Sequence, residues 1–423
     1  MPLILLTRAV ALASALIVIP QDLPTVQRHT IELADDKYEG RGAGYPGERQ
    51  AADYIAAQFK QIGLAPAGDA GGYFQAFRFH VMHPVKPWEI LESRNVIGRI
   101  DGTETALKGE VVVIGAHYDG QGKTGQADPF RVPSRESPAD QIWNSANDNA
   151  ASVAALLEIA RAMKQGTTPP KRSVLFVAFG AEEHGMTGSL HYVAHPAAPI
   201  RDHVAMINLE KLGRVSDKPF NMSGNATSSV WAELVKTIAP QIGVQVVPTN
   251  PFAVPESDHY PFAASGVPAI MFYVAGAPDS HQPSDSAERI DFNRVAQAAR
   301  TVLHMSLDLA SRSQRPSFTP APFPDVGLSV HLATAAEADA RGVAAPQGGL
   351  KVTGVIAGLP ADKAGLRPGD FIVEMANQQF RRDETLAALM AMHRDVLEGK
   401  RGYTLPVKVV RGKTRLDLVM NLR

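Results

Sequence analysis

The most informative segment for the fold is Val111-Val112-Val113-Ile114-Gly115-Ala116-His117-Tyr118-Asp119. Its first four residues are apolar and β-branched, which predicts a short strand buried on both faces, the type found in parallel sheets. His117 and Asp119 lie just after Gly115, which follows the apolar run. Because sites on α/β sheets form at the carboxyl ends of strands, these two residues are the first candidates for a functional site.

Strands and helices alternate on both sides of this stretch. Further strands are predicted at 73–81, 95–100, 172–179, 203–209 and 269–274, and helices at 25–34, 48–62, 149–165 and 292–312. This alternation predicts an α/β domain, residues 21–312, built on a mixed, mostly parallel sheet with helices on both faces.

A second domain is predicted after a linker. Residues 313–325 are proline-rich and aperiodic, as linkers are. Residues 326–423 contain short predicted strands at 327–331, 350–355, 371–375 and 403–410, and helices at 361–364 and 385–399. We therefore expect a small β-rich domain at the C-terminal end.

The first 20 residues are strongly apolar, with Arg8 as their single charge. Their length suits the apolar core of an export signal and is short for a membrane-spanning helix. The prediction is an exported protein (periplasmic, secreted or membrane-anchored), with the segment either cleaved or retained as an anchor. The alternative is a buried first helix of the mature fold.

Composition excludes several kinds of chemistry. The 42 basic and 43 acidic residues nearly cancel, so nothing indicates binding to nucleic acid. The chain contains no cysteine, which excludes disulfides, thiolate metal sites, a cysteine nucleophile and lipidation of a cysteine. Any metal site must therefore use nitrogen and oxygen ligands.

Several other polar residues fall at strand ends or helix starts. They are Asp148 between two asparagines, the pair Glu182-Glu183, Glu210 and His281. Each alone is more often an ordinary loop or helix-cap residue, but together with His117 they provide enough ligands for two zinc ions that share a carboxylate. We expect Asp148 to be that bridge and Asp119 to fix the tautomer of His117. Of the two adjacent glutamates, one can bind metal while the other faces the water that attacks the substrate.

Six motifs in order carry a resemblance that covers about residues 25–312. They are Gly-Ala-His117-Tyr-Asp119, Asn-Asp148-Asn-Ala-Ala-Ser, Phe-Gly-Ala-Glu182-Glu183-His-Gly-Met-Thr-Gly-Ser189, Asn-Leu-Glu210, Ser257-Asp-His-Tyr-Pro-Phe262 and His281-Gln-Pro-Ser-Asp285. The chain resembles the co-catalytic di-zinc exopeptidases of the bacterial leucyl aminopeptidase type, relatives of glutamate carboxypeptidase and glutaminyl cyclase.

The resemblance implies a zinc exopeptidase fold, two zinc ions and peptide substrates with a free N-terminus. It implies that Asp148 bridges the ions, with His117 and Glu210 at one and Glu183 and His281 at the other. It also implies that Glu182 is the general base. His259 is not expected to be a ligand.

One residue departs from the family, which most often has aspartate where Glu210 stands. The longer side chain could alter the distance between the metals or weaken one site. A cyclase of this group uses one zinc and lacks the first histidine, so the presence of His117 favours the two-metal hydrolase. A carboxypeptidase-like relative and a metal-free binding protein with a degenerate peptidase fold remain alternatives.

The C-terminal region resembles a bacterial PDZ domain. The resemblance lies in Val326-Gly-Leu-Ser-Val330 and, more strongly, in residues 354–374, Gly-Val-Ile-Ala-Gly-Leu-Pro-Ala-Asp-Lys-Ala-Gly-Leu-Arg-Pro-Gly-Asp-Phe-Ile-Val-Glu. It implies binding of a peptide or protein C-terminus by strand addition, with Gly327 and Leu328 in the carboxylate-binding loop. The alternative is a packing module that binds no peptide.

Overall fold

The computed structural model describes residues 23–81, 89–126, 140–320, 326–332, 335–343, 347–380 and 404–421. The predicted export segment, residues 1–20, and the predicted helix 385–399 lie outside these residues. Among the described helices, none has both the length and the apolarity needed to cross a bilayer.

In the described part of the chain, nine strands form one large sheet in the order β1-β3-β5-β4-β6-β9-β7-β8, with β2 on β3. Its strands are β1 (Ala65–Pro66), β2 (Phe74–Val81), β3 (Glu89–Ile100), β4 (Val111–His117), β5 (Ser173–Phe179), β6 (His203–Glu210), β7 (Phe220–Ser223), β8 (Val246–Pro248) and β9 (Ala269–Tyr273). At the centre, β4 runs parallel to β5 and β6, and β6 runs parallel to β9. β3 and β7 pair antiparallel with the central strands, so the sheet is mixed, as predicted, with a parallel centre.

Alternate residues of β4 and β5 pack against different helical layers. Val112 and Ile114 belong to the core on one face, together with side chains of α1, α2, α3, α5 and α7. Val111 and Val113 belong to the core on the other face, with Tyr192 of α4 and Phe262 of α6. Burial on both faces explains why these strands are apolar throughout.

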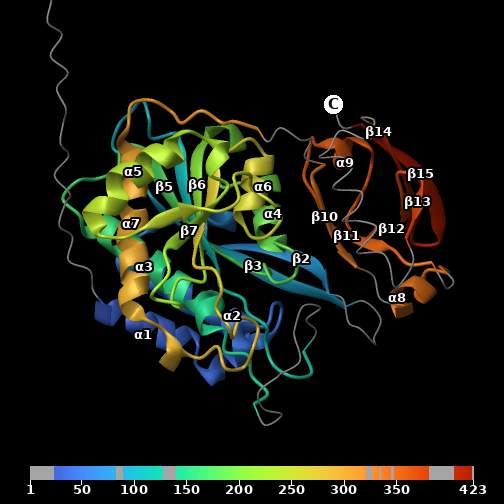
Figure 1. Cartoon of the computed structure of the whole chain (residues 1–423), viewed down its shortest axis with the longest axis horizontal. Coiled ribbons are helices and arrows are strands. Elements are labelled where there is room, and N and C mark those ends of the chain that lie inside the picture. Colours follow the sequence, from blue (N-terminus) through green and yellow to red (C-terminus); the bar gives the residue numbers. More distant parts are fainter. Residues whose placement is uncertain are drawn as a thin grey trace, which may run out of the picture.

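Figure 1 shows the central sheet between these two groups of helices. Their bounds are α1 (Leu23–Leu33), α2 (Pro46–Ile62), α3 (Ala151–Gln165), α4 (Thr187–Ala194), α5 (Val230–Ile242), α6 (His259–Ala264) and α7 (Phe292–Ser311).

Arg41 forms hydrogen bonds to several loops around the predicted site. Its side chain is fully buried and donates hydrogen bonds to the carbonyls of Leu33, Tyr118 (2.8 Å), Asn144 (2.9 Å) and Ser145 (2.8 Å). A buried guanidinium must be satisfied in this way. It holds the segment after β4 against the segment that leads into Asp148.

The C-terminal region forms a second sheet, drawn in orange and red in Figure 1. Six strands of the described residues pair antiparallel in the order β10-β11-β12-β14-β15, with β13 on β12. They are β10 (Leu328–Leu332), β11 (Leu350–Val355), β12 (Phe371–Met375), β13 (Gln378–Gln379), β14 (Thr404–Arg411) and β15 (Thr414–Asn421), accompanied by α8 (Ala335–Ala340) and α9 (Pro360–Lys363). Leu350, Val352, Ile372 and Val407 contribute to its own apolar core. The sequence analysis did not predict β15.

Candidate metal centre

The ends of three parallel strands bring the first candidate residues together. His117 is the last residue of β4 and Glu210 is the last residue of β6. Glu182 and Glu183 follow the end of β5 by a few residues. Because β5, β4 and β6 are parallel neighbours, their carboxyl ends lie at one edge of the sheet.

Asp148 lies in a turn, Ala146–Ala150, that leads into α3. The carboxylate of Asp285 holds this turn, since it accepts hydrogen bonds from the backbone N–H groups of Asn147 (2.9 and 3.1 Å) and Asp148 (3.0 Å). Asn149 donates from its side chain to the carbonyl of Leu209 in β6 (2.9 Å). The turn is thereby fixed relative to both the His281 loop and the sheet. The sequence analysis assigned no role to Asp285, although it lies in the quoted His281–Asp285 motif.

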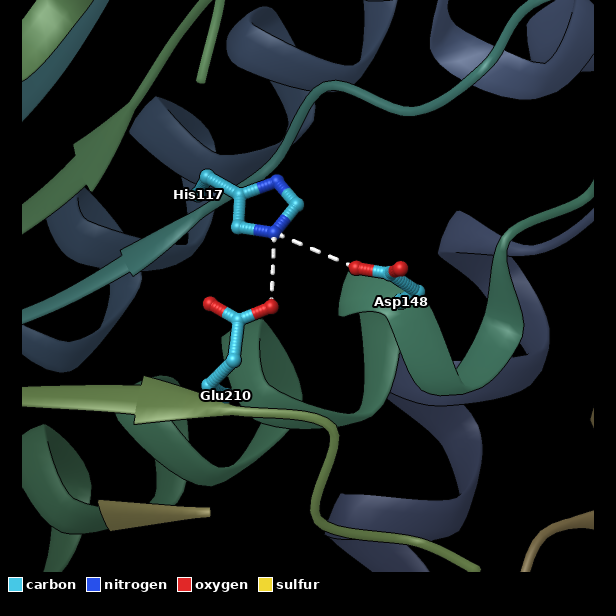
Figure 2. A group of neighbouring side chains, drawn as sticks. All are labelled: His117, Asp148 and Glu210. Atoms are coloured by element: carbon cyan, nitrogen blue, oxygen red, sulfur yellow. Dashed lines mark hydrogen bonds and ion pairs between the residues drawn. The ribbon is translucent and has the colours of Figure 1, made fainter. Parts of the chain in front are cut away.

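The first group of candidate ligands consists of His117, Asp148 and Glu210, which Figure 2 shows pointing toward one another. Nε2 of His117 lies 3.3 Å from Oε1 of Glu210 and 3.4 Å from Oδ1 of Asp148. All three side chains are buried.

The second group consists of Asp148, Glu183 and His281. Nε2 of His281 lies 3.1 Å from Oδ2 of Asp148 and 3.4 Å from Oε2 of Glu183. Oε1 of Glu183 is buried and has no hydrogen-bond partner among the described residues. A buried carboxylate oxygen without a donor is expected where a cation supplies the missing interaction.

Both groups fit a metal ion of the zinc type. Within each group the ligand atoms lie within 4.8 Å of one another. Imidazole nitrogen and carboxylate oxygen are zinc ligands, and three protein ligands leave a position for water or substrate. Asp148 belongs to both groups and offers one oxygen to each. All five residues predicted as ligands are therefore brought together around a shared carboxylate.

Asp119 lies beside His117 and also contacts the backbone of the two glutamates. The atom of Asp119 nearest to Nδ1 of His117 is the backbone carbonyl oxygen, at 3.2 Å, while its carboxylate oxygen Oδ1 lies at 3.6 Å. The carboxylate accepts hydrogen bonds from the backbone N–H groups of Glu182 (3.0 Å) and Glu183 (3.2 Å). It therefore positions the two glutamates, while the backbone carbonyl is the closer partner of His117. Local sequence spacing does not reveal this division.

The two histidines of the site lie close to several carboxylates, which raise the pKa of both imidazoles. Burial by itself lowers the pKa of His117, but the carboxylates of Glu210 and Glu182 raise it well above the ordinary value. The charge of Glu183 raises the pKa of His281 to about 11. The surrounding carboxylates thus favour positive charge at both histidines, and a bound metal ion would supply such charge.

The pKa values of two carboxyl groups in the site, those of Glu182 and Asp148, shift in opposite directions. Burial raises the pKa of Glu182 well above its ordinary value, and the nearby charge of Glu210 adds to this. Burial also opposes ionisation of Asp148, but Lys211 and the two histidines hold its pKa well below the usual range. Asp148 therefore stays ionised as a ligand must, while Glu182 has the greater tendency to take up a proton.

Two further residues of the site were not identified from the sequence. The ammonium nitrogen of Lys211 lies 3.1 Å from Oδ2 of Asp148. The hydroxyl of Ser257 donates to Oε2 of Glu210 (2.8 Å) and accepts from the side chain of Asn208 (2.8 Å). Lys211 adjoins Glu210 in sequence and Ser257 begins a quoted motif, but neither position shows which atom it would contact. His259 is buried and belongs to neither of the two ligand groups.

Known proteins share this fold and part of the sequence. Aminopeptidase YwaD of Bacillus subtilis is 30% identical over 236 residues, which cover 53% of this chain and 46% of that protein. The chain therefore spans about half the length of this relative. The aminopeptidase from Aneurinibacillus sp. strain AM-1 superposes with a TM-score of 0.54 at 17% identity, covering 72% of this chain and 97% of the other. The glutaminyl cyclase of Porphyromonas gingivalis has the same fold, with a TM-score of 0.52 at 18% identity, covering 67% and 97%.

Two family models match the chain in regions that agree with the two sheets. A PDZ domain model matches residues 351–398, which confirms the resemblance of the C-terminal region. The model of peptidase family M28 matches residues 95–306, which contain all the candidate ligands and Glu182. The chain belongs to peptidase family M28.

Proposed function

We propose that this protein is a zinc-dependent exopeptidase that removes the N-terminal residue from peptides. The observation that carries the proposal is the position of Asp148, whose Oδ1 lies 3.4 Å from His117 while Oδ2 lies 3.1 Å from His281. One carboxylate facing two histidines from opposite oxygens is the arrangement that a pair of metal ions requires. Membership of peptidase family M28 and the likeness to aminopeptidases support the same activity.

Asp148 would be shared by the two ions, with His117 and Glu210 completing one site and Glu183 and His281 the other. When bound, the zinc ions supply a Lewis acid for the scissile carbonyl and make water a stronger acid. Glu182 accepts the proton of the attacking water and then donates it to the leaving amine. Burial and the nearby charge of Glu210 raise its pKa, which favours uptake of a proton by this carboxylate.

Asp119 and Asp285 keep these groups in place. Asp119 binds the backbone of both Glu182 and Glu183, so the general base and a ligand are held by one carboxylate. Asp285 holds the backbone of Asp148. Because a small displacement of a general base lowers the rate strongly, these contacts are part of the catalytic geometry.

The experiment is an aminoacyl-p-nitroanilide panel run with and without a chelator, together with Glu182→Gln. We expect chelation to abolish hydrolysis, and Glu182→Gln to lower kcat by about 10²–10⁴-fold while zinc content stays at two per chain. Glu233→Gln is the matched control, because the Glu233 side chain is 64% exposed. Full activity in Glu182→Gln would refute the general-base assignment.

Zinc analysis and further substrate assays on the same purified protein distinguish the proposed function from its alternatives. Less than one zinc per chain after gentle purification would favour a metal-free binding protein. Hydrolysis of dipeptides that need a free C-terminus, without hydrolysis of aminoacyl-p-nitroanilides, would favour a carboxypeptidase. Ammonia release from N-terminal glutamine would favour a cyclase, although the site contains His117 together with Glu210 as a first ligand group.

We also propose that the PDZ domain binds a peptide or protein C-terminus along β10, with Gly327 and Leu328 at the carboxylate. β10 ends the strand order of the second sheet in the described residues, which is the position where an added peptide strand would pair. Gly327 has a φ of 66°, which suits a tight loop before the strand. Binding of peptides with a free C-terminal carboxylate, but not of their amides, would support this assignment, and equal binding of both would contradict it.

Export is proposed from the apolar segment 1–20. Cell fractionation of the chain with and without this segment tests it, and retention of the full chain in the cytosol would contradict it. The predicted domain limits, 21–312 and 326–423 with a linker at 313–325, are proposed on the same footing and are tested by limited proteolysis.

A further inference from the structure

A small apolar cluster joins the peptidase to the PDZ domain. It contains Met186, Leu190 and Tyr260 from the peptidase and Ile356 from the PDZ domain, with Ala264 and Leu359 packed against them. The four central side chains are at most 9% exposed. Figure 1 shows the edge with β10 and β11 facing α4 and α6, and α4 contacts β11 directly.

On the peptidase side, the cluster adjoins residues of the candidate metal centre. The backbone N–H of Met186 donates to the carbonyl of Glu182 (2.8 Å), and Thr187 N–H donates to Ala181 (3.0 Å). These bonds close the turn that carries the proposed general base. A displacement of Met186 would therefore act on the backbone of Glu182.

Tyr260, another peptidase residue of the cluster, is also linked by hydrogen bonds to the candidate metal centre. The backbone N–H of Tyr260 donates to the carbonyl of Ser257 (3.0 Å), and the hydroxyl of Ser257 donates to Glu210 (2.8 Å). Met186 and Tyr260 are thus each within one turn of a residue that contacts or forms the site.

On the PDZ side, the same cluster adjoins the proposed carboxylate-binding loop. A Cβ atom added to Gly327 would lie 2.6 Å from Cβ of Leu359, so the two residues are in close contact. The carbonyl of Gly327 accepts a hydrogen bond from Ile356 N–H (2.9 Å), and the carbonyl of Val326 accepts one from Ala361 N–H (2.9 Å). Any change in the loop at 326–328 on binding a peptide would act on Ile356 and Leu359.

We propose that the PDZ domain regulates the peptidase through this contact, with Leu359 acting on Met186 and thereby on the turn that holds Glu182. The inference rests on the proposed function, because it takes Glu182 as the general base. Contacts between domains of one chain resemble transient interfaces, so a cluster of this size can be made or broken by a ligand. Leu359 and Met186 are positioning residues, since neither is placed at substrate.

The test compares Leu359→Asp with Ala357→Asp in the full-length zinc-loaded chain. Leu359 packs in the cluster, while Ala357 is exposed in the same loop, so both variants add one charge to one segment. We expect Leu359→Asp to change kcat on leucine p-nitroanilide by about fivefold or more, with KM and zinc content little changed. Ala357→Asp should leave kcat at the wild-type value. In Leu359→Asp, the amides of residues 182–187 should also exchange hydrogen faster.

Leu190→Ala, Leu359→Ala and their combination provide a second test that needs no charge in the cluster. Residues that act through one contact give non-additive effects, so the double variant should lose no more kcat than the more affected single variant. Effects that multiply, or an unchanged kcat and unchanged exchange in Leu359→Asp, would overturn the proposed regulation. If the wild-type chain hydrolysed no aminoacyl substrate, the proposed function would fail instead, and the exchange measurement would still report whether the contact reaches Glu182.

Discussion

Lys211 places its ammonium nitrogen 3.1 Å from Oδ2 of Asp148, the carboxylate that both groups of candidate ligands share. The same nitrogen lies 3.6 Å from Oε1 of Glu210. A fixed positive charge at this position competes with a metal ion for the same oxygens.

Replacement of Lys211 by methionine should therefore strengthen zinc binding. We expect affinity to rise about tenfold, because a unit charge in contact with the ligands is removed from a partly exposed position. Competition with a chromophoric chelator measures the change. Lys236→Met, at an exposed position of α5, is the control. Weaker zinc binding in Lys211→Met would show that the lysine supports the ligands rather than competing with the metal.

Asp285→Asn should weaken zinc binding without replacing any ligand. The carboxylate of Asp285 accepts from the backbone N–H groups of both Asn147 and Asp148, and an amide in its place turns a donor toward one of them. Loss of such an orienting partner typically costs about 10–100-fold in metal affinity. Zinc content after dialysis against a weak chelator measures it.

Asp101→Asn serves as the control for Asp285, because its side chain is 72% exposed and pairs only with Arg99 among the contacts described. Two zinc ions retained equally by Asp285→Asn and by the control would contradict the role assigned to Asp285.

Glu210→Asp tests whether zinc binding in this chain requires glutamate at the position where the family most often has aspartate. The carboxylate of Glu210 reaches both His117 and the hydroxyl of Ser257. Aspartate withdraws it by roughly 1.5 Å, one carbon–carbon bond. We expect the variant to lose the first zinc ion preferentially, so that stoichiometry falls toward one per chain.

Elemental analysis measures the zinc content of Glu210→Asp, with Glu233→Asp, a change at an exposed position, as the control. A variant that retains two ions and full kcat would show that the first site adapts to either side chain.

Zinc affinity should rise with pH across the neutral range. The charge of Glu183 raises the pKa of His281 to about 11, and the pKa of His117 is also raised well above its ordinary value. Both groups are therefore protonated without metal at neutral pH and must lose a proton to become ligands. Each such proton makes the apparent affinity rise about tenfold per pH unit until the histidine's own pKa is reached.

Calorimetric titration with zinc in two buffers of different ionisation enthalpy counts the released protons. The expected release at pH 7 is close to one proton per histidine ligand. Zinc binding without proton release at pH 7 would mean that the histidines are neutral in the metal-free chain.

The α/β architecture and the set of candidate ligands could both be predicted from the amino-acid sequence. Short apolar runs such as Val111–Ile114 indicate strands buried on both faces, and polar residues that follow them must lie at strand ends. His117 and Glu210 are 93 residues apart in sequence, and they became candidates for one site only when the motifs were considered together with the family resemblance. The PDZ region was likewise recognisable from short motifs.

Which atoms contact one another could not be predicted in the same way, because it depends on packing in three dimensions. The carboxylate of Asp119 binds the backbone of Glu182 and Glu183, which depends on how the loop after β4 lies against the loop after β5. The contacts of Asp285, and the packing of Leu359 against the cluster that contains Met186, join segments more than a hundred residues apart. Local periodicity reports which face of an element is buried, but such distances are set by strand order and by helix and domain packing.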